Sequence, residues 1–95
     1  MYKEKYKELE NMKTLSDEIS AIMDNSIKEI LDRTEGHKSA RDYLIEGVCH
    51  NCILVLTNTK YKKDEKIASV KRQAEHYVSD IDQAIEDFSS CTRKQ

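Results

Sequence analysis

The sequence predicts an all-α fold, and three features of the chain carry this prediction. The 95 residues include no proline and only two glycines, Gly36 and Gly47. Proline removes a helical hydrogen bond and glycine weakens a helix, so a chain poor in both can be helical nearly throughout. Apolar residues also recur every three or four positions, which is the spacing of one helix face. We therefore expect helix over more than ~70% of the residues, against about a third in an average protein.

The first helix is expected over about residues 2–33. Its apolar repeat contains Tyr2, Tyr6, Leu9, Met12, Leu15, Ile19, Ile22, Met23, Ile27, Ile30 and Leu31. The polar run from Thr34 to Lys38 ends it, and Gly36 suits a left-handed C-terminal cap. Residues 14–18, Thr-Leu-Ser-Asp-Glu, also have the composition of a helix start. The alternative is therefore that residues 1–13 form a separate short helix or a frayed arm.

Two more helices follow, over about residues 39–59 and 64–92. Ser39 with Asp42 resembles a capping box at the start of the second helix, and Asp64 can cap the third. Apolar residues of the third helix form a heptad seam about three heptads long. The members of this seam are Ile67, Val70, Ala74, Tyr77, Ile81, Ala84 and Phe88.

Short joints between these helices predict a single domain, residues 1–95, folded as an antiparallel three-helix bundle with a long first helix. At about 1.5 Å per residue the first helix is ~48 Å long and the second ~31 Å. The leading turns of the first helix, with Tyr6 and Leu9, then overhang unless something covers them. We therefore expect a dimer or a tight heteromer rather than an isolated monomer.

Composition narrows the class of protein. The net charge is −2, from 16 basic and 18 acidic residues, which gives no general attraction to nucleic acid or to anionic membranes. No apolar run approaches the roughly 18 residues of a membrane span, and residues 1–6 contain no apolar signal core. The three cysteines are an odd number and are expected to be reduced thiols. These features predict a cytoplasmic protein without a membrane segment.

One motif suggests a metal or redox function. Cys49-His50-Asn51-Cys52 lies past the middle of the second helix, whereas a thioredoxin-type pair opens a helix after a strand. Covalent haem attachment needs histidine directly after the second cysteine, and Ile53 stands there. Zinc needs two further ligands, for which His76 and Cys91 are the candidates. The favoured interpretation is that the two cysteines of the motif are metal-free packing residues, so no metal or cofactor is predicted.

Charge is unevenly distributed in the last third of the chain. Residues 60–72 contain six bases and two acids, and residues 75–87 contain five acids and neither lysine nor arginine. The basic stretch is a candidate nucleic-acid contact, but it has only Tyr61 for stacking and belongs to an acidic chain. We interpret it as a solvated helix start. The two stretches can also pair with each other across a two-fold axis.

Catalysis is not predicted. The three histidines, His37, His50 and His76, lie in different segments, and none belongs to a set of serine, cysteine or carboxylate residues that the sequence identifies as a triad. We therefore expect that the protein is not an enzyme.

The second helix has two apolar faces. At about 100° per residue, a wide arc faces the predicted core, and its members are Leu44, Ile45, Val48, Cys49, Cys52, Ile53, Val55 and Leu56. Tyr43 and Leu54 fall on the opposite side, near Ala40 and Gly47. A glycine within a helix costs ~1 kcal/mol relative to alanine, so close approach of another backbone is one benefit that would explain Gly47. The alternative is that Tyr43 and Leu54 are scattered exposed residues that need no explanation.

The second half of the chain resembles the last two helices of BAG domains, which are three-helix bundles that bind Hsp70-type chaperones. The resemblance covers residues 54–78, with Leu54-Val55-Leu56, a polar joint, Ile67, Lys71-Arg72 and Val78. The sequence departs from the family at its acidic, arginine and glutamine positions, which fall on Thr57, Lys71 and Ser79. Because of these departures, the chaperone-binding function is not carried over.

We therefore expect a non-catalytic protein–protein interaction module, acting as an adaptor, a regulatory subunit or an inhibitor through apolar helix faces. The candidate partner-binding residues are Tyr6, Leu9, Tyr43, Gly47 and Leu54. Two alternatives stay open: a metal- or redox-responsive helical module using Cys49 and Cys52, and a nucleic-acid accessory protein using residues 60–72.

Overall fold

Five helices make up the computed structural model, which describes residues 2–12 and 16–93, and the side chains of residues 3–12 and 16–89. They are α1 (Tyr2–Glu10), α2 (Asp17–Arg33), α3 (Lys38–Thr57), α4 (Lys63–Ser79) and α5 (Ile81–Arg93). This part of the chain is 85% helical and contains no strand. The all-α prediction is confirmed, whereas the three-helix bundle with a long first helix is wrong.

The first predicted helix is divided because a new helix starts at residue 17. Ser16 is the N-cap of α2, and its hydroxyl accepts a hydrogen bond from the amide of Ile19 at 3.3 Å. Asp17 and Glu18 occupy the first turn, where carboxylates interact favourably with the helix dipole. The alternative of a separate short helix at the start is confirmed as α1. Leu15 of the predicted repeat lies outside the described residues.

A buried threonine fixes the joint between α2 and α3. Thr34 is 0% exposed, caps α2, and donates its hydroxyl hydrogen to the carbonyl of Ile30 at 2.6 Å. Gly36 follows with a φ of 83°, the left-handed conformation for which glycine was expected there. Arg41 of α3 donates from Nε to Thr34 Oγ1 at 3.3 Å, so one side chain links the start of α3 to the end of α2.

Two helix starts differ slightly from the prediction. The N-cap of α3 is His37 rather than Ser39, and among the described residues it forms no side-chain capping hydrogen bond. The N-cap of α4 is Lys62, which places Asp64 in the first turn, where its charge favours the helix dipole. These shifts of one or two positions leave the faces of both helices unchanged.

The third predicted helix is interrupted at Asp80, between α4 and α5. The amide of Asp80 donates to the carbonyls of Tyr77 and Val78, a tighter pattern than that of an α-helix. Because a single residue separates the two helices, the predicted heptad seam keeps its phase through the break. Its buried members are Val70, Ala74, Ile81 and Ala84, and its half-buried members are Ile67, Tyr77 and Phe88.

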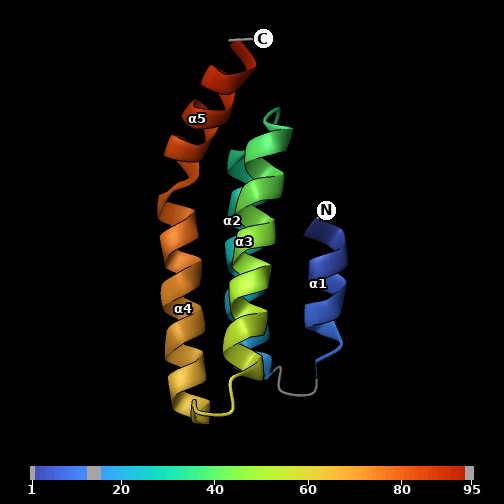
Figure 1. Cartoon of the computed structure of the whole chain (residues 1–95), viewed down its shortest axis with the longest axis vertical. Helices are drawn as coiled ribbons and strands as arrows, with labels where there is room; N and C mark the ends of the chain where they lie inside the picture. Colours follow the sequence, from blue (N-terminus) through green and yellow to red (C-terminus); the bar gives the residue numbers. More distant parts are fainter. Residues whose placement is uncertain (1, 13–15, 94–95) are drawn as a thin grey trace.

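The central helix of the molecule is α3 (Figure 1). It packs against α1, α2, α4 and α5, with α1 on one side and α4 on the other. In this view α2 lies behind α3, and α2 also packs against α4. The molecule is elongated and measures 45 × 22 × 22 Å. One face of α3 is therefore covered by α2, while no helix of the described chain covers the opposite face.

Candidate interaction surface on α3

The inner face of α3 forms the centre of the core. Its buried residues are at most 8% exposed, and they are Leu44, Ile45, Val48, Cys49, Cys52, Val55 and Leu56. They belong to one cluster with Met23 and Ile30 of α2 and Val70 of α4. Ile53, the remaining member of the predicted arc, is half-buried. The core-facing arc predicted from helical periodicity is confirmed.

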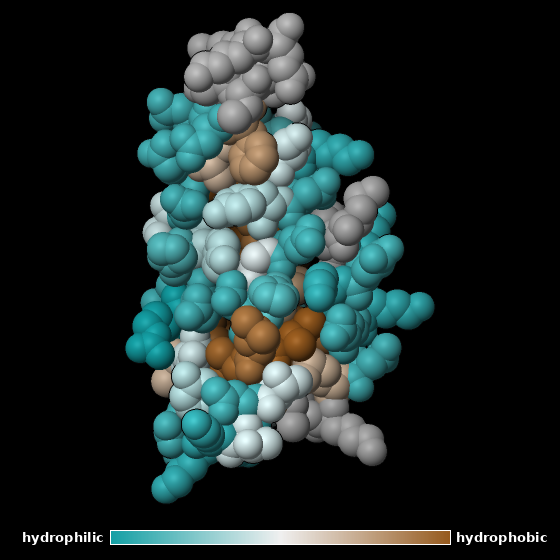
Figure 2. Space-filling model, viewed as in Figure 1, coloured by the Kyte–Doolittle hydropathy of each residue, from teal (hydrophilic) through white to brown (hydrophobic). Residues whose placement is uncertain are grey.

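The outer face of α3 leaves two large apolar side chains in solvent. Tyr43 is 50% exposed and Leu54 is 53% exposed, and Tyr61 is the third exposed side chain of this kind among the described residues. Tyr43 and Leu54 are three helical turns apart, about 16 Å, and so lie on one side of α3. Ala40, predicted near them, is 1% exposed and belongs to the core. Figure 2 shows apolar side chains gathered over the lower half of α3 within a hydrophilic surround.

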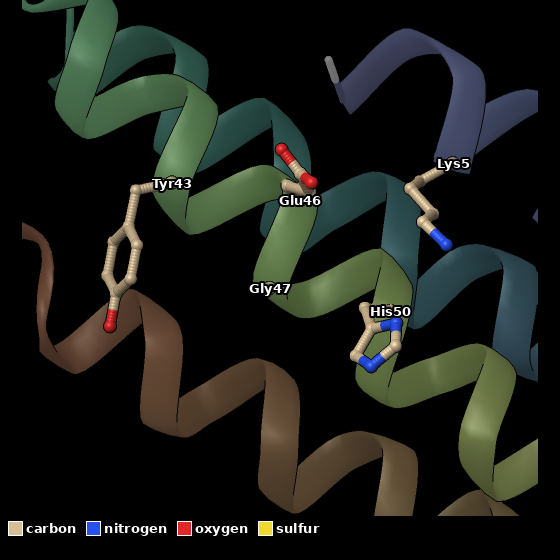
Figure 3. Close-up of a pocket in the computed structure, with 5 residues that line it drawn as sticks. All are labelled: Lys5, Tyr43, Glu46, Gly47 and His50. Carbon is tan, nitrogen blue, oxygen red and sulfur yellow. The ribbon is translucent and has the colours of Figure 1, made fainter.

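A groove of about 510 Å³ lies on this outer face (Figure 3). It is lined by Lys5 of α1 and by Tyr43, Glu46, Gly47 and His50 of α3. The side chain of Lys5 extends from α1 over α3 toward His50, so α3 forms the floor and α1 forms one wall. Tyr43 extends toward the opposite wall, where its ring centroid lies 5.5 Å from that of Phe88 in α5. The groove therefore combines an aromatic end with a glycine floor and side chains of both charges.

The space beside the glycine in this floor is filled by Tyr77 of α4. A Cβ atom at Gly47 would lie 2.7 to 2.9 Å from ring and hydroxyl atoms of Tyr77, closer than such atoms pack. Asn51 holds the arrangement, because its Nδ2 donates to the carbonyl of Gly47 at 2.8 Å and to the hydroxyl of Tyr77 at 2.9 Å. The close approach at Gly47 is thus made by an aromatic ring of the same chain and not by another backbone, which was one explanation that the sequence suggested for this glycine.

Leu9 and Tyr6, the two candidate residues of the first segment, make contacts within the chain. Leu9 is 2% exposed and belongs to the core, because α1 folds back against α3. Tyr6 is half-buried, and its hydroxyl donates to Asp24 Oδ1 of α2 at 2.6 Å. This hydrogen bond to a carboxylate, together with partial burial, raises the pKa of Tyr6 to about 12. The predicted overhang is therefore replaced by a helix that covers one edge of the core.

Cys49 and Cys52 are core residues with free thiols. They are at most 1% exposed, and burial raises the pKa of each thiol to about 12. Because the thiolate is the form that attacks electrophiles and binds metals, such thiols are poorly suited to either role at neutral pH. Within residues 3–12 and 16–89, no three or more histidine, cysteine or acidic side chains are placed to hold a metal ion. The side chain of Cys91 lies outside these residues.

The basic stretch 60–72 occupies the joint after α3 and the first half of α4. One of its lysines is used structurally, because Lys66 Nζ donates to the carbonyl of Leu56 at 3.0 Å and interacts with the negative end of α3. The other bases are exposed, namely Lys60, Lys62, Lys63, Lys71 and Arg72, as are His37, His50 and His76.

None of the described helices is both long enough and apolar enough to cross a lipid bilayer.

Sequence reasoning identified Tyr43, Gly47 and Leu54 on this surface and missed the residues around them. Glu46 and His50 flank Gly47 on the same side of α3, so helical periodicity alone contained the signal that places them. Lys5 and Tyr77 come from α1 and α4, and no local pattern indicates that they reach α3.

Comparison with known proteins does not assign the chain to a family. No protein-family model, no curated protein and no solved structure matches it. The resemblance to BAG domains therefore gains no support. The function has to be argued from the surface itself.

Proposed function

We propose that this protein is a non-catalytic protein–protein interaction module that binds its partner through the outer face of α3. The observation that carries the proposal is the exposure of Tyr43 and Leu54, 50% and 53%, on one side of α3, with the groove beginning at Tyr43. Covering the exposed half of a leucine side chain contributes about 1 kcal/mol, by the usual scale for apolar burial. A partner that covers both side chains therefore gains binding free energy that the isolated chain forgoes.

The groove has the composition of a recognition surface. Tyrosine is enriched among residues that dominate binding energies, and Tyr43 is held at the rim by its contact with Phe88. Beside Tyr43, the groove residues Lys5, Glu46 and His50 supply polar groups that can fix the orientation of the partner. A module of this kind acts as an adaptor, a regulatory subunit or an inhibitor, because the surface offers contacts rather than reacting groups.

The buried cysteines support a reducing location for this activity. Free thiols such as those of Cys49 and Cys52 persist in the cytosol, whereas oxidising compartments favour disulfides. We therefore place the proposed interaction in the cytoplasm.

Affinity capture with paired variants tests the proposal. Leu54→Asp places a charge on the outer face, and Ala21→Asp places the same charge on an exposed position of α2, behind α3. We expect Leu54→Asp to reduce capture of the wild-type binding partners at least tenfold and Ala21→Asp to leave capture unchanged. Circular dichroism of both variants verifies that they are folded. Equal capture by the wild-type protein and by folded Leu54→Asp would show that this face is not the interaction surface.

A further inference from the structure

We infer that the partner seated on the outer face of α3 is a second copy of this chain, related by a two-fold axis that makes the two α3 helices antiparallel. This inference rests on the proposed function and names its partner. In such a pair the same face of both copies is used, so every contact occurs twice. The face must therefore complement itself when it is turned end to end.

The apolar side chains satisfy this condition. When α3 is laid antiparallel on a second α3 so that Leu54 of each copy meets Tyr43 of the other, Gly47 of each copy falls opposite His50 of the other. Tyr43 and Leu54 are half-exposed, and between them each His50 meets the helix surface at Gly47, beside the Tyr77 ring that fills the space next to this glycine. One register therefore brings the exposed apolar side chains of the two copies together in two equivalent contacts.

The charges of the groove select the antiparallel orientation. In this register Glu46 of one copy lies one residue from the position facing His50 of the other, so its carboxylate can accept a hydrogen bond from that imidazole. In a parallel pair Glu46 would face Glu46, and like charges in direct opposition are unfavourable. Lys5 is placed at the same level by α1 and adds a base on the rim.

The flanking helices give an independent indication of the same orientation. Tyr77 contacts Gly47 and Asn51, so the middle of α3 lies level with residue 77 of the α4–α5 rod. The basic stretch 60–72 lies on one side of this level, and the acidic stretch 75–87 begins beside it and extends to the other. When the two copies are turned end to end, α4 and α5 of one lie beside α5 and α4 of the other. Each basic stretch then approaches an acidic one, whereas a parallel pair would place α4 of each copy beside α1 of the other, because α1 and α4 lie on opposite sides of α3.

The exposed area of the chain is consistent with this arrangement. The protein exposes 6508 Å², and a compact monomer of 11.1 kDa is expected to expose about 5,700 Å². The excess, about 800 Å², accompanies the elongated shape, and an interface of standard size takes about 800 Å² from each partner, so the chain has surface enough to supply one.

Two exposed-site variants test both the association and its orientation. Tyr43→Glu and Leu54→Lys each place an unpaired charge against an apolar group in both halves of the homodimer. In a mixture, the heterodimer places Glu at position 43 opposite Lys at position 54 and keeps one native Tyr43–Leu54 contact. We expect sedimentation at micromolar concentration to give twice 11.1 kDa for the wild type, 11.1 kDa for each variant alone, and twice 11.1 kDa for the equimolar mixture. Circular dichroism shows whether each variant keeps its helices.

Each contrary result separates this inference from the proposed function. A wild-type chain that sediments at 11.1 kDa overturns the self-association, while Leu54-dependent capture of another protein would leave the proposed function standing. A dimeric wild type whose folded variants fail to recombine overturns the antiparallel register, since a parallel pair never brings residues 43 and 54 together. Equal capture by the wild type and Leu54→Asp would overturn the proposed function itself.

Discussion

Two faces of the same helix have opposite environments. On the inner face of α3, Leu56 is 1% exposed, and on the outer face Leu54, two positions earlier, is 53% exposed. The residue type is the same and the backbone is helical at both positions. The difference arises from phase: two residues rotate the side chain by about 200° around the helix axis. The inner face of α3 therefore contributes to stability through burial, whereas the side chains of Tyr43 and Leu54 on the outer face remain exposed for the association proposed above.

The largest expected effect compares two neighbouring positions. Val55→Asp buries an unpaired charge in the core, because Val55 is 8% exposed, and should cost about 3–5 kcal/mol, enough to unfold a small domain. Leu54→Asp should change the free energy of unfolding by less than about 1 kcal/mol, as exposed substitutions do. Urea denaturation followed by circular dichroism measures both values. If Leu54→Asp unfolds the protein as Val55→Asp does, the two faces are not distinct.

The cysteine pair tests the inner face through its dependence on pH. Replacing Cys49 and Cys52 with alanine should cost about 2 kcal/mol in total through lost burial and leave the helices intact. Folding raises the pKa of both thiols from 9.0 to about 12, so the folded state binds these protons more tightly than the unfolded chain. Their contribution to stability is complete below pH 9 and is lost as the pH rises toward 12.

The measurement is urea denaturation at pH 8 and about pH 10.5 for the wild type and the double variant. We expect the wild type to lose more stability over this interval, because the variant lacks the two thiols and shares every other titrating group. Equal losses would mean that the thiols ionise as readily in the folded protein as in the unfolded chain.

Gly47 lines the groove on the outer face of α3, but the space beside it is filled by the Tyr77 ring of α4. Substitution of Gly47 therefore tests how closely α4 packs at the border between the two faces. Gly47→Ala should destabilise the protein by about 1 kcal/mol, because the new methyl group displaces the Tyr77 ring and its hydrogen bond to Asn51. In a Tyr77→Ala background the same substitution should instead stabilise by about 1 kcal/mol, the usual helix preference for alanine over glycine. Thermal denaturation of the four proteins gives both differences. The same sign in both backgrounds would show that Tyr77 does not explain the glycine.

The smallest expected effect concerns the edge of the inner face that α1 covers. Tyr6→Phe removes the hydrogen bond to Asp24 while keeping the ring, and because this bond is exposed it should cost less than about 1 kcal/mol. Hydrogen exchange should show faster opening of α1 and unchanged protection in α3. Uniformly faster exchange across all helices would mean that α1 is not a separately opening element.

The sequence was sufficient for the features that depend on periodicity. The all-α class, the inner arc of α3 and the heptad seam from Ile67 to Phe88 follow from the spacing of apolar residues, and burial confirms them. The start of α2 was also visible in residues 14–18, because Ser16 followed by two acids is a local capping pattern. The single long helix was preferred only because the apolar repeat runs through this point without a phase change.

The features that escaped prediction depend on contacts between distant segments. The sequence around Asp80 contains neither glycine nor proline, so no residue near this position predicts the break between α4 and α5. Leu9 belongs to the core only because α1 turns back onto α3, and Gly47 is explained only by Tyr77, 30 positions later. The candidate surface was therefore predicted on α3 itself, at Tyr43 and Leu54, but not at the groove wall that Lys5 supplies.

The docking of α1 on α3 has a consequence during synthesis of the chain. The first helix packs chiefly on a helix that is translated roughly 40 residues later, beyond the whole of α2. At about 5–20 residues per second, α1 waits on the order of 2–8 s with Leu9 uncovered before its binding site exists. The helix that is made first therefore stays unpacked throughout the synthesis of α2, and during this interval Leu9 is an apolar group that a chaperone or a neighbouring nascent chain can reach.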